Sequence, residues 1–87
     1  MTRLWTDGDP ISEVVLDTVG HLLAFTWQGR SHTIRQVLHR WHVDADWWSA
    51  QGEVERDYLR VLTVSGLMCE VFHDHITEAW WFSRVYD

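Results

Sequence analysis

The chain has 87 residues, which is enough for one small domain with one modest hydrophobic core. Hydrophobic residues make up 46% and charged residues 23%, an ordinary globular composition that excludes a disordered chain. Thirteen acidic residues against seven basic ones give a formal charge of −6. That balance argues against a strong autonomous nucleic-acid binder, because such proteins neutralise phosphates with Lys and Arg.

The first thirteen residues predict a loosely held N-terminal arm, because Asp7-Gly8-Asp9-Pro10 combines residues that favour turns. We therefore expect an arm at 1–13 and a single small β domain at 14–87. The arm has no apolar run of signal-peptide length, and no window approaches the roughly 20 apolar residues of a membrane span. The sequence predicts a cytoplasmic protein that does not bind membranes.

The β domain is expected to begin with a short β-branched segment at 14–16 that closes at Val19-Gly20. Residues 21–27 are apolar in both alternating registers, as in a strand buried on much of both faces. Gln28-Gly29-Arg30 predicts a turn, after which the chain pairs back as a hairpin.

Residues 33–43 fit two patterns. Ile34, Val37, Leu38 and Trp41 have helical spacing, whereas Val37, His39, Trp41 and Val43 alternate as in a strand. The strand interpretation leaves Ile34 out of phase and requires a β-bulge nearby. Because a hairpin turn precedes the segment and strands follow it, a long bent strand is favoured over a helix.

The rest of the chain predicts strands at 56–64, 67–72 and 79–86, with a two-residue hairpin loop at Ser65-Gly66. Five or six antiparallel strands in meander order must cover one apolar face and protect their edges. The predicted fold is therefore all-β, either a small antiparallel barrel or a strongly curled sheet.

Catalytic and metal-binding patterns are weak. His73-Asp74-His75 has a spacing that places two rings on one face of a strand, and His39 or His42 could add a ligand, but no Cys pair accompanies them. The single cysteine, Cys69, lies in an apolar strand where nothing lowers the pKa of its thiol. We expect no enzyme, no metal and no cofactor.

Aromatic and Arg residues form the most prominent pattern, with seven Trp in the chain. Such residues brace a small core or supply the anchors of a protein interface. Trp47 and Trp48 are adjacent in the most polar connection, where one sheet face cannot easily bury both, so they are the predicted partner-binding residues. One ring is expected to cap the open end of the barrel and the other to contact the partner; the alternative is that both rings fold over the barrel mouth. A structural framework is expected from Trp27, Trp41, Arg56, Tyr58, Trp81, Arg84 and Tyr86. Asp44, Glu70 or Asp87 could supply a carboxylate to a buried Arg.

Several segments together carry a family resemblance: Trp27-Gln28-Gly29-Arg30, the stretch from Trp41 to Trp48, and Arg84-Val85-Tyr86-Asp87. Over residues 21–87 the chain resembles a small bacterial family of unknown function that occurs as a free-standing protein. It also looks like the C-terminal piece of Y-family DNA-polymerase homologues from damage-induced mutagenesis cassettes. The resemblance implies a context in DNA repair and no catalysis, because the acidic metal-binding motifs of a polymerase are absent from this sequence.

The combined expectation is a non-enzymatic adaptor for a protein partner in DNA repair or translesion synthesis, with a DNA-polymerase accessory protein as a candidate partner. The alternative is a module that binds single-stranded nucleic acid through exposed Trp and Arg side chains.

Overall fold

Segments that alternate β-branched or aromatic residues with polar ones are strands in the computed structural model, which describes residues 3–45 and 54–86. Within this part of the chain there is no helix, and so none that is long and apolar enough to cross a membrane. The strands are β1 (Arg3–Pro10), β2 (Ser12–Leu16), β3 (Leu22–Trp27), β4 (Arg30–Ala45), β5 (Val54–Thr63), β6 (Met68–Asp74) and β7 (Ala79–Tyr86).

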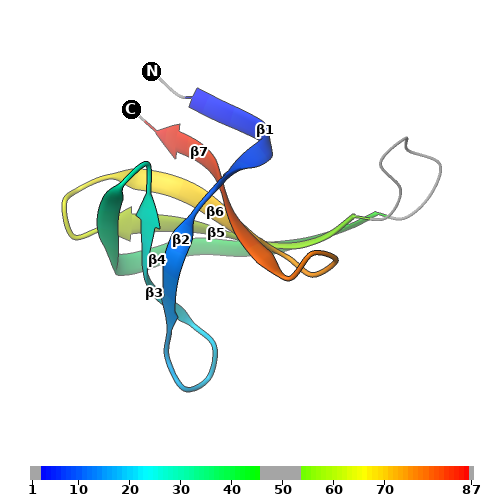
Figure 1. Cartoon of the computed structure of the whole chain (residues 1–87), viewed down its shortest axis with the longest axis horizontal. Coiled ribbons are helices and arrows are strands. Elements are labelled where there is room, and N and C mark those ends of the chain that lie inside the picture. Colours follow the sequence, from blue (N-terminus) through cyan, green and yellow to red (C-terminus); the bar gives the residue numbers. More distant parts are fainter. Residues whose placement is uncertain (1–2, 46–53, 87) are drawn as a thin grey trace.

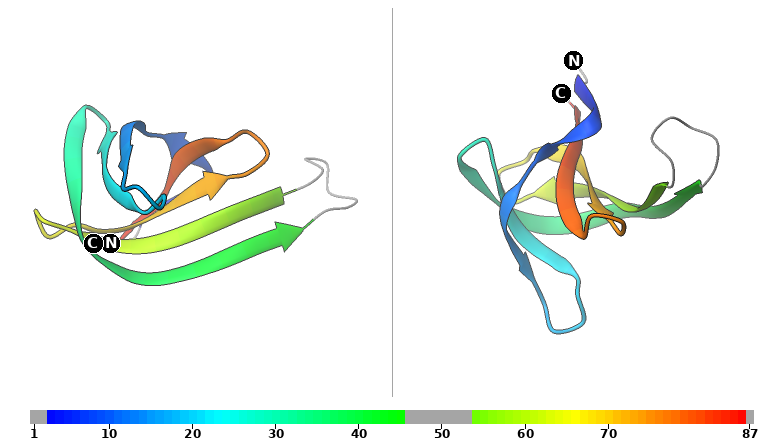
Figure 2. Two further views of the ribbon diagram at one scale, coloured as in Figure 1. Left: turned by 90° about the horizontal axis from the view of Figure 1, so that it is seen from below. Right: turned by 45° about the vertical axis from the view of Figure 1, so that its right-hand side comes forward.

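The strands form one antiparallel sheet in the order β1-β7-β6-β5-β4-β3-β2 (Figure 1). The predicted meander is confirmed for β2 to β7, and β1 adds to the far side of β7. The sheet curls strongly, so that β2 and β3 lie over β5 and β6 (Figure 2). The all-β fold and the curl are confirmed, but the sheet is not closed into a barrel. Its two edge strands, β1 and β2, follow each other directly with Ile11 between them.

The ambiguous segment at 33–43 is part of the long strand β4, as favoured from the sequence. The pairing of β4 with β5 shifts register between Ile34 and Gln36 and again between Val37 and His39. The bulge required near Ile34 is therefore present. These shifts decide which side chains of the second half of β4 face the core.

The N-terminal residues correct the expectation of a loosely held arm. Residues 3–10 form β1, which pairs with β7 from Arg3↔Val85 to Pro10↔Trp81. The pairing is interrupted between Leu4 and Asp9, and Gly8 in this interruption has a φ of +83°. The turn-forming residues of this segment thus lie where the pairing of a strand is interrupted, and not in a free arm.

The core lies on the face of the sheet that the curl encloses, which we call the inner face. It is formed by Leu22, Phe25, Val61, Cys69, Val71 and Phe82. Trp27 stacks on Phe82 with ring centroids 3.7 Å apart, and Trp5 meets both rings edge-on. The indole N–H of Trp27 donates a hydrogen bond to Asp9 Oδ2 at 2.9 Å. Large rings thus supply much of the core in a domain with few residues to bury.

Candidate functional site

One row of polar side chains crosses the inner face where β4, β5 and β6 run side by side. The strand registers pair His42 with Asp57, Asp57 with His73, and His73 with Trp80. Directly paired residues of antiparallel strands project from the same face. Asp57 and the core residue Val61 are four residues apart on β5, so their side chains project from the same face of the sheet. A carboxylate therefore occupies an inward position of β5.

Asp57 connects two histidines with its two carboxylate oxygens. Oδ1 lies 2.6 Å from Nδ1 of His42, and Oδ2 lies 2.5 Å from Nε2 of His75. His75 follows β6, and its backbone N–H donates to the carbonyl oxygen of Glu55 at 2.9 Å. These contacts hold β4, β5 and the turn after β6 together at one end of the sheet.

The electrostatics of the cluster follow from these hydrogen bonds. The bond to Asp57 raises the pKa of His42 above its ordinary value, and the negative charges of Asp57, Asp44 and Glu55 act in the same direction. The hydrogen bonds from His42 and His75 lower the pKa of Asp57. The contacts therefore favour a charged carboxylate beside a protonated imidazole.

The cluster lies in a cavity with a volume of about 510 Å³. Its polar lining includes His42, Asp57, His73 and His75, and its apolar lining includes Leu59 and Trp80. The ring centroids of His73 and His75 are 4.8 Å apart. Several imidazoles and a carboxylate facing one cavity can bind a metal ion or exchange protons with a bound molecule.

The opposite, outer face of the sheet carries the aromatic and Arg pattern of the sequence. An aromatic row crosses four strands and consists of Trp41, Tyr58, Phe72 and Trp81. A charged row lies beside it and consists of His39, Arg60, Glu70 and Arg84. Arg60 connects the two kinds of group, since its guanidinium lies 5.7 Å from the ring centroid of Trp41 and 5.1 Å from that of Tyr86.

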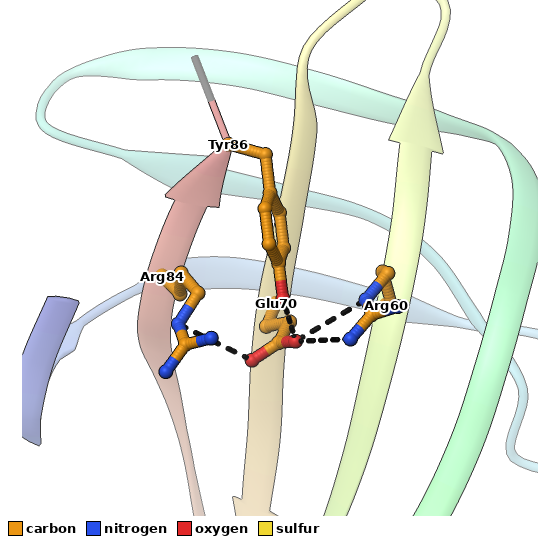
Figure 3. Close-up of polar contacts among 4 residues, drawn as sticks. All are labelled: Arg60, Glu70, Arg84 and Tyr86. Atoms are coloured by element: carbon orange, nitrogen blue, oxygen red, sulfur yellow. Dashed lines mark hydrogen bonds and ion pairs between the residues drawn. The ribbon is translucent and has the colours of Figure 1, made fainter. Parts of the chain in front are cut away.

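Glu70 is the centre of the charged row (Figure 3). Its Oε1 accepts hydrogen bonds from Arg60 Nε at 3.2 Å, from Arg60 Nη2 at 3.0 Å and from the Tyr86 hydroxyl. Nε of Arg84 lies 3.9 Å from Oε2. The Glu70 side chain is only 6% exposed, and these partners supply the charge and the donors that a buried carboxylate needs.

Three residues of the expected framework have ring or charge contacts on the outer face. Trp41 and Tyr58 stack with centroids 5.3 Å apart, and the Arg56 guanidinium lies 4.5 Å from the centroid of the Phe72 ring. Nε of Arg56 is also 3.9 Å from Asp74 Oδ2. Trp47 and Trp48, the predicted partner-binding residues, lie outside the described residues.

The sequence predicted only part of the arrangement of the histidines. His73 and His75 do share one cavity, and His42 joins them, but His39 lies on the outer face and stacks on Trp41 at 5.2 Å between centroids. The sequence reasoning missed Asp57 and Arg60. An inward carboxylate in the alternation of Asp57, Leu59 and Val61 is the signal by which Asp57 could have been found.

Residues 17–87, from the end of β2 to the last residue, match the DUF6504 family, a domain of unknown function. The chain belongs to this family. The DUF6504 region contains β3 to β7, and with them both the cavity cluster and the outer-face rows. The sequence resemblance to a family of unknown function is thereby confirmed, while the match says nothing of DNA polymerases. Neither a curated protein nor a solved structure gives a significant match to this DUF6504 chain.

Proposed function

We propose that this DUF6504 domain is a non-enzymatic protein-interaction module that presents the outer face of its sheet to a partner. The observation that carries the proposal is the concentration of Trp, Tyr and Arg in the two outer-face rows. These three residue types dominate the binding energy of protein interfaces. Arg60 and Arg84 are 38% and 36% exposed, so their guanidinium groups are within reach of a partner.

The contacts of Glu70 with Arg60 and Arg84 support the same role, because they hold the two guanidinium groups in place before a partner binds. A side chain that is already ordered loses less conformational entropy on binding than a free one. Met68 adds an apolar position to this face, with 37% of its surface exposed beside Leu62 and Tyr86. The sequence-predicted contacts Trp47 and Trp48 follow β4 along the chain and are proposed as an additional part of the surface.

The proposed partner is a DNA-polymerase accessory protein, the Y-family polymerase homologue of a bacterial mutagenesis cassette, with the complex acting in translesion synthesis in the cytoplasm. This rests on the sequence resemblance between residues 21–87 and the C-terminal piece of such polymerase homologues. A module that occurs both fused to a protein and separately is a candidate to act on that protein in trans.

Binding of single-stranded nucleic acid is the second candidate function. It is favoured by Arg guanidinium groups beside the rings of Trp41 and Tyr86, the combination on which bases stack. The net charge of −6 opposes it, so we expect affinity no tighter than about 0.1 mM at physiological salt.

The test is a binding titration between the purified domain and the polymerase homologue of the same genome. Met68→Glu places a carboxylate on the outer face, and we expect it to weaken the complex at least tenfold. Leu23→Glu is the matched control, because Leu23 is 45% exposed on β3, away from the outer-face rows. Absence of wild-type binding, or equal binding by the two variants, would contradict the proposal. Sub-micromolar, salt-sensitive binding to an oligonucleotide would favour the nucleic-acid alternative.

A further inference from the structure

The cavity cluster contains three groups with the ligand chemistry of a metal site on three separate parts of the chain. His42 comes from β4, Asp57 from β5 and His75 from the turn after β6. One ligand atom of each residue lies within 4.8 Å of the other two, and Asp57 is in hydrogen-bond contact with Nδ1 of His42 and with Nε2 of His75. We propose that these three residues bind a divalent transition-metal ion, with Zn²⁺ as the preferred ion.

The spacing is close to the one such an ion requires. Zn²⁺ binds His nitrogen and carboxylate oxygen at about 2.0–2.2 Å, so its tetrahedral ligand atoms are about 3.3–3.6 Å apart. In the structure Oδ1 of Asp57 lies 2.6 Å from Nδ1 of His42, and Oδ2 lies 2.5 Å from Nε2 of His75. Both distances are shorter than the ion requires, because each oxygen is hydrogen-bonded to one ring. An ion would replace these hydrogen bonds after side-chain rotations that move the ligand atoms apart by about an ångström. The side chains of His42 and Asp57 are 47% and 50% exposed, which leaves them free to rotate.

The charge around the cluster favours a cation. Asp44 and Glu55 are directly paired across β4 and β5, on the same face as His42 and Asp57. Like charges directly opposite in a sheet are destabilising. Arg40 is the cationic side chain that also lines the cavity, against three carboxylates at this end of the hairpin. A bound divalent ion would offset the repulsion that the paired carboxylates create.

The donor set selects the kind of ion. Two imidazoles and one carboxylate suit Zn²⁺ and its neighbours among the transition metals, whereas Mg²⁺ and Ca²⁺ prefer all-oxygen sites. Three protein ligands leave a fourth position for water or another donor. His73 lies on the same row of the sheet as Asp57 and is a candidate for that position. Metal binding of this kind goes beyond the proposed partner-binding function, which uses the other face of the sheet.

The experiment is isothermal titration of Zn²⁺ into the metal-free, full-length protein without an affinity tag, since a His tag would itself bind the ion. We expect one ion per chain, with no heat from Mg²⁺ or Ca²⁺. Co²⁺ gives a second readout, because its visible absorption intensifies strongly in a four-coordinate site. His42→Ala, Asp57→Asn and His75→Ala should each weaken Zn²⁺ binding by more than about tenfold.

His39→Ala is the matched control, because His39 lies three residues before His42 on the same strand but on the outer face. It should bind Zn²⁺ as the wild type does. His75→Ala keeps the test decisive if a strand variant fails to fold, since His75 is an exposed turn residue. Failure of the wild type to bind one ion, or unchanged binding by folded His75→Ala, would overturn the proposal and leave the cluster as hydrogen bonds alone.

Discussion

Replacing Glu70 with Gln tests whether the charged row holds the sheet together. The substitution keeps the shape of the side chain but removes the charge that Arg60 and Arg84 share. Breaking a fully buried ion pair costs about 3–5 kcal/mol, but both guanidinium groups are more than one third exposed and remain solvated. We therefore expect Glu70→Gln to lower the free energy of unfolding by about 2–3 kcal/mol.

That loss is large for a domain of this size. At about 0.05–0.15 kcal/mol per residue, 87 residues correspond to about 4–13 kcal/mol in total. Each kcal/mol shifts the Tm of such a domain by about 4–8 °C, so a loss of about 2–3 kcal/mol corresponds to a decrease of about 8–24 °C. Urea unfolding followed by Trp fluorescence measures the change as a shifted midpoint with an unchanged slope.

Two further variants control the interpretation. Glu78→Gln makes the same chemical change at an exposed position between β6 and β7 and should alter stability by less than about 0.5 kcal/mol. Tyr86→Phe removes one donor to Glu70 and should cost about 1–2 kcal/mol, less than Glu70→Gln itself. A stability of Glu70→Gln within about 0.5 kcal/mol of the wild type would refute the reasoning, because the carboxylate would then contribute nothing beyond its shape.

Further predictions concern β1, the histidine cluster and the cysteine. Gly8→Ala should be more destabilising than Gly20→Ala: both positions have positive φ, but only at Gly8 would the added Cβ meet a neighbour, at 2.7 Å, and equal Tm losses would contradict this. In EDTA, the raised pKa of His42 contributes stability that is present below its unfolded value of 6.5 and is lost as pH rises through the folded value. The lowered pKa of Asp57 contributes stability that is present above 3.8 and lost as pH falls through its folded value, so urea midpoints should be highest between about pH 4 and 6.5, and Asp57→Asn should flatten the profile. Burial raises the pKa of Cys69 to about 12, so iodoacetamide should label the thiol only after unfolding; rapid labelling of the folded protein would contradict the buried position.

Most strands could be predicted because apolar and polar residues alternate clearly along them and because the turns between them contain Gly. The bulge near Ile34 was also predictable, because one apolar residue out of phase in a strand requires an extra residue in the pairing. β1 could not be predicted, since its stability comes from pairing with β7, at the other end of the chain. Local sequence around Gly8 favours turns, and tertiary pairing overrides that preference.

The candidate site was only partly predictable for a related reason. Which face His42 occupies depends on the register shifts in β4, and the partners of Asp57 depend on the registers of three strands together. The sequence gives the spacing of His73 and His75, but it does not show which strand pairs beside them or which residues of that strand they meet. Glu70 was one of three carboxylates, with Asp44 and Asp87, that the sequence offered to a buried Arg. Its pairing with Arg60 depends on the register of β5 and β6, which the sequence alone does not give.

The pairing of β1 with β7 also determines how the chain could be rewired. Arg3 and Val85 are paired in adjacent antiparallel strands, and the Cα atoms of such pairs are about 5 Å apart. The start of β1 therefore lies beside the end of β7 (Figure 1). A linker of a few residues would therefore join them, and new ends could be opened in the exposed turn between β2 and β3, where a Cβ at Gly20 would meet nothing within 4 Å. In such a circular permutant β1 would follow β7 as an ordinary hairpin, and its pairing would change from the most distant contact in the sequence to one of the most local.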